Sequence, residues 1–402
     1  MYRDFFRPMA STFALLLSFS FLFSDCKKEE EDSIGQLTTI QAAIACKTLD
    51  ECFDSTASLS KSGASFQVFK KDGTRVYFRE RGLLTADKVG PIFSASKLVT
   101  ASVIMAFLSG TCGSSANSMN LNTTTGNILG WTGVKGSITL RQLLSFTSGL
   151  YSNNGSAEMG SCVFTLPNGA SAGDKNSCTD YIRDNTQTDD QPGEVFYYNS
   201  FHMAVAQRMA EIDSGKNWQD LFEDCIASPL SIVVDSGTGN GIWYANISNK
   251  TGDGSLAGAY GLYLTANDYA KIMHMLANEG NSGAIISASN VNEIFKDQYE
   301  VNTKIKYSQF ALFGYYWHYG LGNWRFCSQP NDSAACDQDV NNHSFGANGF
   351  YPWIDRNKEY YAVFGVNEFN SNPFNIISIL QPNSASLFFG EDAKKYIPAL
   401  LE

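Results

Sequence analysis

Two β-hairpin patterns lie near opposite ends of the chain. The first covers 66–78 and carries Asp72-Gly73 at its turn, a dipeptide that is typical of tight hairpins. The second joins 350–355 to 360–366 across a polar turn. If both hairpins belong to one sheet, the two chain ends close that sheet and the middle of the chain is inserted between them. The sequence therefore predicts an α+β fold, with an antiparallel sheet built from both chain ends and flanked by helices.

The segments between the hairpins carry helical patterns. Polar stretches rich in Asn, Ser, Thr and Gly separate these patterns and predict surface loops. We expect one domain over 61–402, with a mainly helical insertion at roughly 110–250. Apolar residues at helical spacing predict helices within this domain at 98–108, 140–144, 203–212, 269–276 and 391–401.

The first 25 residues have the pattern of an export signal. Arg3 and Arg7 provide a basic start, and an apolar run over 10–23 follows them. This run is too short to span a membrane comfortably as a helix. We therefore expect 1–25 to be a signal peptide that is removed on export.

Cys26 is the candidate attachment point for a lipid. It follows the apolar run and precedes a charged stretch over 27–32, an arrangement that resembles a bacterial lipoprotein signal. Asp25 departs from the small residue that is usual before such a cysteine. We expect Cys26 to be lipidated, 26–60 to form a tether and an N-terminal segment, and the protein to be anchored in the bacterial envelope. Plain secretion is the alternative.

The remaining cysteines are even in number, as in an exported protein with disulfide bonds. The chain has nine cysteines, and setting Cys26 aside leaves eight. Eight cysteines allow many connectivities, so proximity along the chain is the whole basis for a pairing. Proximity favours three short-range pairs and leaves the last by elimination: Cys46–Cys52, Cys162–Cys178, Cys327–Cys336 and Cys112–Cys225.

The charge balance narrows the range of partners. The chain has 29 Lys and Arg against 40 Asp and Glu, which gives a formal net charge of -11. Binding to a phosphate backbone needs a basic surface, so we expect no nucleic-acid partner. We expect a small-molecule substrate. We expect no metal or cofactor, because no metal-ligand spacing occurs at the four histidines: His202, His274, His318 and His343.

Ser94 and Lys97 are the candidate nucleophile and its base. Three residues are nearly one helical turn, so the two side chains project from one face. A serine hydroxyl is a poor nucleophile until a base removes its proton, and a buried lysine can be that base because burial disfavours its charge. A helix start also presents backbone N–H groups to a developing oxyanion. Lys97 opens an almost wholly apolar segment, which favours this interpretation.

Two other serines match nucleophile motifs but lack suitable surroundings. Ser58 and Lys61 have the same spacing, but a polar stretch follows, so we interpret them as a helix N-cap and a solvated lysine. Ser171 is the centre of a Gly-x-Ser-x-Gly motif, which needs a strand before it and a helix after it. Its neighbours are polar, so we expect a flexible loop between Cys162 and Cys178.

Several segments together resemble the serine β-lactamase-like hydrolases. That family contains class C β-lactamases, D-alanyl-D-alanine peptidases, family VIII-type esterases and 6-aminohexanoate-dimer hydrolases. The resemblance implies a β-lactamase/transpeptidase-like fold, with Ser94 as the acylated nucleophile and Lys97 as its base partner. The segments occur in family order at 93–97, 138–150, 192–200, 257–270, and 319–322 followed by 346–350 and 353–355.

The third segment implies a catalytic tyrosine in one of two registers. The Pro-Gly-x-x-Phe frame makes Tyr198 the family tyrosine and Ser200 the residue that is usually Asn. A literal match to Tyr-x-Asn gives Tyr197 and Asn199 instead. We favour Tyr198 because the whole frame supports it. A tyrosine beside a lysine can relay protons to a leaving group, since an adjacent cation favours the phenolate.

The last motif departs from the family pattern. The family has Lys or His, any residue and then Gly on a strand that lines the site, and here these are Ala347, Asn348 and Gly349. The cation that would hold a substrate carboxylate is therefore missing, although His343 lies nearby in the sequence. Gly349 still allows close approach of a substrate, and the Phe350 N–H is the candidate second oxyanion donor.

These observations predict an exported serine hydrolase that forms an acyl-enzyme on an ester or amide. The missing cation favours a neutral ester or amide over β-lactams and D-alanyl-D-alanine peptides, which carry carboxylates. The alternative is a catalytically weak or inactive relative that binds envelope material or another protein. The intact set of Ser94, Lys97 and Tyr198 favours the enzyme, because a binding module has no physical need for it.

Overall fold

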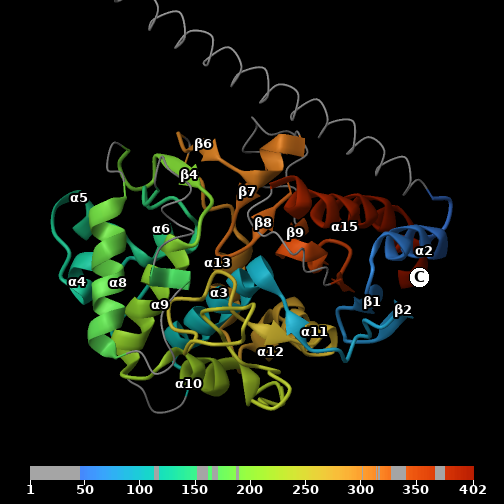
Figure 1. Cartoon of the computed structure of the whole chain (residues 1–402), viewed down its shortest axis with the longest axis horizontal. Coiled ribbons are helices and arrows are strands. Elements are labelled where there is room, and N and C mark those ends of the chain that lie inside the picture. Colours follow the sequence, from blue (N-terminus) through green and yellow to red (C-terminus); the bar gives the residue numbers. More distant parts are fainter. Residues whose placement is uncertain are drawn as a thin grey trace, which may run out of the picture.

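The computed structural model describes most of the chain, and Figure 1 shows its arrangement. Cys26 and the segment 1–25 lie outside the described residues, as does the predicted pair Cys327–Cys336. The described residues are 46–112, 117–151, 162–164, 171–186, 190–300, 302–313, 315, 317–326, 341–366 and 376–402.

A seven-stranded antiparallel sheet contains both predicted hairpins. In β1 and β11, which come from opposite ends of the chain, Val68 lies opposite Ala362. The prediction of a sheet closed by the two chain ends is therefore confirmed. In spatial order the strands are β2 (Arg75–Gly82), β1 (Gly63–Lys70), β11 (Tyr360–Gly365), β10 (Tyr351–Asp355), β9 (Asn341–His343), β8 (Trp324–Arg325) and β7 (His318–Tyr319).

Helices cover both faces of this sheet. On one face lie α2 (Leu49–Leu59) and α15 (Ile376–Tyr396), which are side by side near the C-terminus (Figure 1). The Phe66 ring of β1 lies 4.8 Å, centroid to centroid, from the Phe389 ring of α15. The other face packs against α11 (Ala266–Ala277), where the Tyr361 ring lies 6.0 Å from that of His274. This alternation of faces follows from the two-residue period of the strands.

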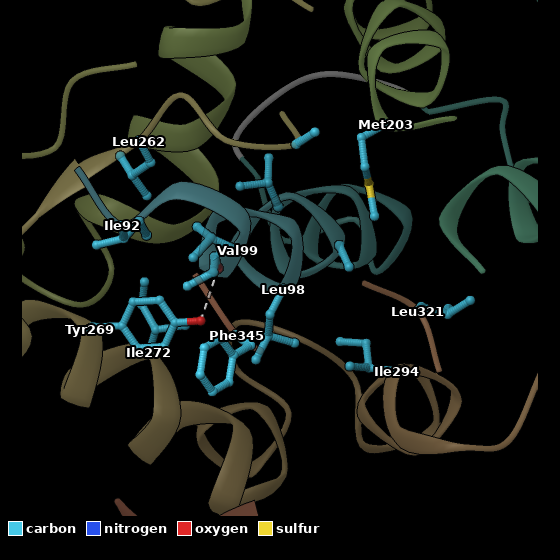
Figure 2. Packing of buried hydrophobic residues seen from close by; sticks show 14 of the residues in the cluster. Ile92, Leu98, Val99, Met203, Leu262, Tyr269, Ile272, Ile294, Leu321 and Phe345 are labelled. Carbon is cyan, nitrogen blue, oxygen red and sulfur yellow. Dashed lines mark hydrogen bonds between the residues drawn. The ribbon is translucent and has the colours of Figure 1, made fainter. Parts of the chain in front are cut away.

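The helix α3 (Ser96–Leu108) occupies the centre of the helical part of the molecule. Every residue from Ser96 to Phe107 is buried, so the helix is enclosed by protein on all sides rather than amphipathic. Figure 2 shows Leu98 and Val99 of this helix among side chains from distant segments, including Ile272 and Leu321. A helix that is enclosed in this way can bury a polar group at its first turn.

The other predicted helices are also present, one with the predicted boundaries and the others with shifted boundaries. They correspond to α6 (Leu140–Leu144), α9 (Phe201–Ser214), α11 and, at the chain end, α15 with α16 (Pro398–Leu401). The inserted region adds α4 (Thr125–Leu129), α5 (Gly133–Gly136), α8 (Ala172–Asn185), α10 (Trp218–Phe222) and a π-helical turn, η3 (Glu223–Ala227). None of the described helices has the length and apolarity that crossing a membrane requires.

The N-terminal helix α2 lies before residue 61, where we expected the domain to begin. Thr48 caps it by accepting a hydrogen bond from the Glu51 N–H. Cys52 and Phe53 are fully buried in the common core. This part of the segment 26–60 is therefore an integral layer of the fold.

Three of the four predicted disulfide bonds are present. Two are short-range, Cys46–Cys52 and Cys162–Cys178, and one spans 113 residues, Cys112–Cys225. The long-range bond ties the loop after α3 to η3 in the inserted region. It therefore helps to hold the end of the central helix in place.

Candidate active site

Ser94 and Lys97 are in direct contact at the start of α3. Ser94 lies in a short 3-10 turn, η1 (Phe93–Ala95), and is partly exposed. Lys97 is only 3% exposed, and its Nζ lies 2.9 Å from Ser94 Oγ. A second hydrogen bond runs from Lys97 Nζ to the carbonyl of Ala259, at 2.8 Å. A reachable hydroxyl therefore stands beside a nitrogen that is almost cut off from water.

The turn that carries Ser94 is held from several sides. Phe93 has a φ of 48°, a strained value for a bulky residue directly before the candidate nucleophile. Tyr269 of α11 donates a hydrogen bond of 3.0 Å to the Ala95 carbonyl, and Figure 2 shows its ring below α3. The Ser96 hydroxyl accepts from the Leu262 N–H, at 3.2 Å. These contacts from remote segments fix the backbone conformation that presents the hydroxyl.

Tyr198 lies beside Lys97, at the end of the short strand β4 (Val195–Tyr197). Lys97 Nζ is 4.7 Å from the centroid of the Tyr198 ring. The ring is 8% exposed and stacks on Trp324, with centroids 5.0 Å apart. Tyr197 instead stacks on Tyr151, at 5.0 Å and 17° between the planes. Of the two sequence registers, the one through Tyr198 puts an aromatic ring against the lysine.

The next two residues, Asn199 and Ser200, directly precede α9. Asn199 is 5% exposed, and its amide donates to the Leu150 carbonyl while its oxygen accepts from the Phe201 N–H. Its side chain therefore ties two backbone segments together. Ser200 is 9% exposed and precedes the first residue of α9.

His202 is a buried neutral group behind the tyrosine. Its Nδ1 lies 2.7 Å from Ser148 Oγ and its Nε2 2.9 Å from the Tyr197 carbonyl. The pKa of His202 is lowered to about 3, chiefly by burial and to a smaller extent by the nearby Lys97 charge, against the raising effect of the hydrogen bond to the Tyr197 carbonyl. A neutral ring that donates from Nε2 accepts at Nδ1, so the Ser148 hydroxyl is the donor in that pair.

The last predicted segment forms the opposite side of the site. The turn η5 (Ala347–Gly349) contacts η1. A Cβ at Gly346 would lie 2.3 Å from the Ile92 carbonyl, so only glycine allows this approach. Asn348 is 6% exposed with a φ of 67°, and its Nδ2 has no hydrogen-bond partner among the described residues. Ala347 adds no charge to this turn.

Two backbone N–H groups remain as candidate oxyanion donors. Ala95 N–H donates to the Ile92 carbonyl and Gly349 N–H to the Gly346 carbonyl, so these two are committed to turns. Within the part of the chain that the structure describes, the N–H groups of Ser94 and Phe350 donate to no acceptor. They come from the two turns in contact, η1 and η5, as an oxyanion hole between them requires.

Comparison with known protein families identifies the family of this chain. The model of the beta-lactamase family matches residues 54–378. The chain belongs to the beta-lactamase family. Members of this family are serine hydrolases, and this chain is an enzyme of the same Ser-x-x-Lys type.

Solved structures of other proteins share the fold. A Bacteroides dorei protein assigned as a beta-lactamase is 24% identical with a TM-score of 0.67, covering 87% of this chain and 98% of its own. EstCE1, a hydrolase with promiscuous acyltransferase activity, is 14% identical with a TM-score of 0.59, covering 84% and 98%. A Bacillus anthracis protein assigned as a 6-aminohexanoate-dimer hydrolase is 16% identical with a TM-score of 0.56, covering 88% and 82%. No curated protein matches the chain.

The two rejected serines differ from their sequence interpretations, although neither resembles the family site. Ser58 lies in the last turn of α2 instead of at an N-cap, and its hydroxyl donates to the Ser55 carbonyl. Ser171 caps α8, where we expected a flexible loop. Its hydroxyl accepts from the Asp174 N–H and donates to the Asp174 carboxylate, a capping box that the spacing of the two residues encodes.

Sequence reasoning missed three groups of this family site. The Ala259 carbonyl that holds Lys97 has no sequence signature, because every residue has a carbonyl. Trp324 and Phe146 enclose Tyr198, with ring centroids at 5.0 and 5.3 Å, and they come from segments far apart in the chain.

Among the described residues there is no cluster of three side chains that could hold a metal ion.

Proposed function

We propose that this family member hydrolyses a neutral ester or amide through an acyl-enzyme on Ser94. The hydrogen bond between Ser94 and the buried Lys97 is the observation that carries the proposal. Burial favours the neutral amine, and a neutral amine at 2.9 Å can take the hydroxyl proton as the oxygen attacks.

Besides the nucleophile and its base, the acylation step needs donors for the developing charge and a path for the proton. Ser94 Oγ bonds to the substrate carbonyl carbon, and the charge that develops on the carbonyl oxygen is received by the N–H groups of Ser94 and Phe350. The proton taken by Lys97 passes through Tyr198 to the leaving alcohol or amine, whose bond to the carbonyl carbon breaks. Water then attacks the carbonyl carbon of the acyl-enzyme and gives a proton to the same groups, which pass it to Ser94 Oγ as the bond between Oγ and the acyl carbon breaks and the acid is released.

The turn opposite the nucleophile supports a neutral substrate. Ala347 stands where the family has Lys or His, so this position offers no charge to a substrate carboxylate. The surrounding side chains are aromatic, including Tyr198 and Trp324, and such walls favour an apolar acyl or leaving group. β-Lactams and D-alanyl-D-alanine peptides would lose a charge-assisted contact here.

Covalent labelling tests the nucleophile. A fluorophosphonate should add one adduct to the intact protein, and peptide mapping should locate it on Ser94. An adduct on Ser58 or Ser171 would overturn the assignment, and a folded protein that takes no label would favour the binding-module alternative. Rates on p-nitrophenyl esters, set against a chromogenic cephalosporin, then test the preference for neutral substrates.

We also propose that the mature enzyme is exported and held on the membrane through a lipid on Cys26. The signal-like segment before Cys26 and the odd total of nine cysteines support this. Cys26→Ser should leave soluble or unprocessed protein with an intact Ser94 site. The denatured, unreduced protein should titrate with essentially no free thiol. A Cys26→Ser variant that is cleaved correctly yet stays on the membrane would refute the anchor.

A further inference from the structure

A second cavity lies on the face of the sheet that packs against α11. It has a volume of about 570 Å³ and opens between the β1–β2 hairpin and α11. Its lining includes none of Ser94, Lys97 and Tyr198, so it is separate from the candidate active site. No step of the proposed reaction uses it.

Aromatic rings form the floor of this hairpin cavity. Phe69 and Tyr361 stack with centroids 5.0 Å apart and only 8° between their planes. The imidazole of His274 lies 6.0 Å from the Tyr361 ring, and Met275 and Leu230 complete the apolar part of the wall. A flat apolar group can lie against such a surface.

Gln67 brings an unsatisfied donor to the same cavity. Its side chain is fully buried, and its Oε1 accepts from Arg75 Nη1 at 3.2 Å. That bond fixes the orientation of the amide, because a flipped amide would turn its NH₂ group toward the guanidinium. Gln67 Nε2 then has no partner among the described residues, and neither does His274 Nδ1. Buried polar atoms in this state are costly unless a ligand or water forms a hydrogen bond with them.

The charge at the mouth comes chiefly from Arg75. This residue is exposed, its guanidinium lies 4.2 Å from the Phe78 ring centroid, and it makes no ion pair with a described carboxylate. The second cation, Lys271, is already paired with Asp268 at 2.8 Å. Asp72, at the hairpin turn, accepts from the Thr74 N–H. An anion that enters the cavity therefore meets one guanidinium that forms no ion pair with a described carboxylate.

We propose that the hairpin cavity binds a small organic carboxylate with a flat apolar body. The carboxylate would accept hydrogen bonds from Arg75 and from Gln67 Nε2, and the apolar body would lie on the Phe69–Tyr361 floor. Guanidinium groups favour carboxylates because two parallel N–H groups match two oxygens. This site is independent of the hydrolytic function proposed above.

Isothermal titration of the intact protein tests the proposal with three probes. Phenylacetate carries both the ring and the charge, 2-phenylethanol keeps the ring without the charge, and acetate keeps the charge without the ring. Phenylacetate should bind at one site, at least about tenfold more tightly than either of the others. Equal binding of phenylacetate and 2-phenylethanol, or no binding at millimolar phenylacetate, would overturn the proposal.

Two variants then locate the binding. Arg75→Ala should weaken phenylacetate binding by about tenfold or more, whereas Arg81→Ala, a matched exposed arginine on the same strand, should leave it unchanged. Gln67→Leu should also weaken it, provided that circular dichroism shows a native fold. Because Arg75 is exposed, its variant will fold, and binding that survives Arg75→Ala would place the ligand elsewhere and refute the site.

Discussion

Ser58 with Lys61 and Ser94 with Lys97 repeat one spacing in two opposite environments. Ser58 and Lys61 are both exposed at the end of α2, and the Ser58 hydroxyl bonds to its own helix. Lys97 is 3% exposed within a helix that is buried on all sides, and its amine contacts Ser94.

The difference indicates that the Ser-x-x-Lys spacing can support catalysis only where the lysine is removed from water. An exposed lysine keeps its proton near neutral pH and cannot act as a base, whereas burial penalises the charged form. In both cases the sequence places a serine and a lysine three residues apart, but α2 ends at Leu59, so Lys61 lies beyond the helix that carries Ser58. Only the segments packed around α3 remove water from one of them.

The largest difference between the two environments should appear when the hydroxyl of Ser94 or of Ser58 is removed and the activity is measured. Ser94→Ala should lower kcat/KM for a neutral ester by about 10⁴-fold or more, since no nucleophile remains. Ser58→Ala should leave the rate unchanged, and so should Ser171→Ala. Steady-state kinetics on purified variants measures both. A large loss in Ser58→Ala, with activity kept in Ser94→Ala, would reverse the comparison.

The next largest loss of activity should come from variants of Lys97 and Tyr198, the two groups proposed to transfer the proton. Lys97→Ala and Tyr198→Phe should each cost about 10²–10⁴-fold in kcat, and the double variant little more, because groups that act as a unit are non-additive. Lys61→Ala and Tyr197→Phe are the matched controls and should be near wild type. Loss in Tyr197→Phe with near-normal turnover in Tyr198→Phe would move the catalytic register by one residue.

The burial of His202 near Lys97 should also affect how the stability of the fold depends on acid pH. His202 has a pKa of about 3 in the folded protein and about 6.5 when unfolded, so the unfolded state binds more protons between these values. This group therefore makes stability fall as pH drops from about 6.5 toward 3, by up to about 1.4 kcal/mol for each pH unit, with no contribution above 6.5.

A non-titrating variant isolates this effect. In His202→Gln the contribution should disappear, so that wild type loses stability relative to the variant as the pH falls. Urea unfolding at several pH values measures the difference. A constant gap between the two proteins from pH 7 to pH 4 would mean that the ring is not held neutral.

The smallest expected effect is on stability at neutral pH. Lys97→Met replaces a buried amine with an apolar side chain of similar length and should raise the free energy of unfolding by about 1–2 kcal/mol while activity is lost. The exposed Lys61→Met should change it by less than about 0.5 kcal/mol. Thermal melts of both variants would decide this, and a strong destabilisation in Lys97→Met would mean that the amine holds the site together.

Periodic patterns were sufficient for much of the fold. The two hairpins and the helices at α3, α6, α9 and α11 were predicted because alternation and helical spacing are local properties of the chain. The helix α2 was missed because its residues were assigned to the tether and N-terminal segment over 26–60. Ser171 was misjudged because the capping box that starts α8 was not recognised among polar residues.

The candidate site also has some features that the sequence determined and others that only the tertiary structure decided. By itself the sequence determined which side chains are available: a serine and a lysine one turn apart, a tyrosine after a Pro-Gly frame, and no cation at Ala347. Only the tertiary structure decided that Lys97 is buried, that the Ala259 carbonyl holds its amine and that the Tyr198 ring lies beside it. Burial and these contacts depend on segments more than a hundred residues away, and no local pattern can encode the exclusion of water that they produce together.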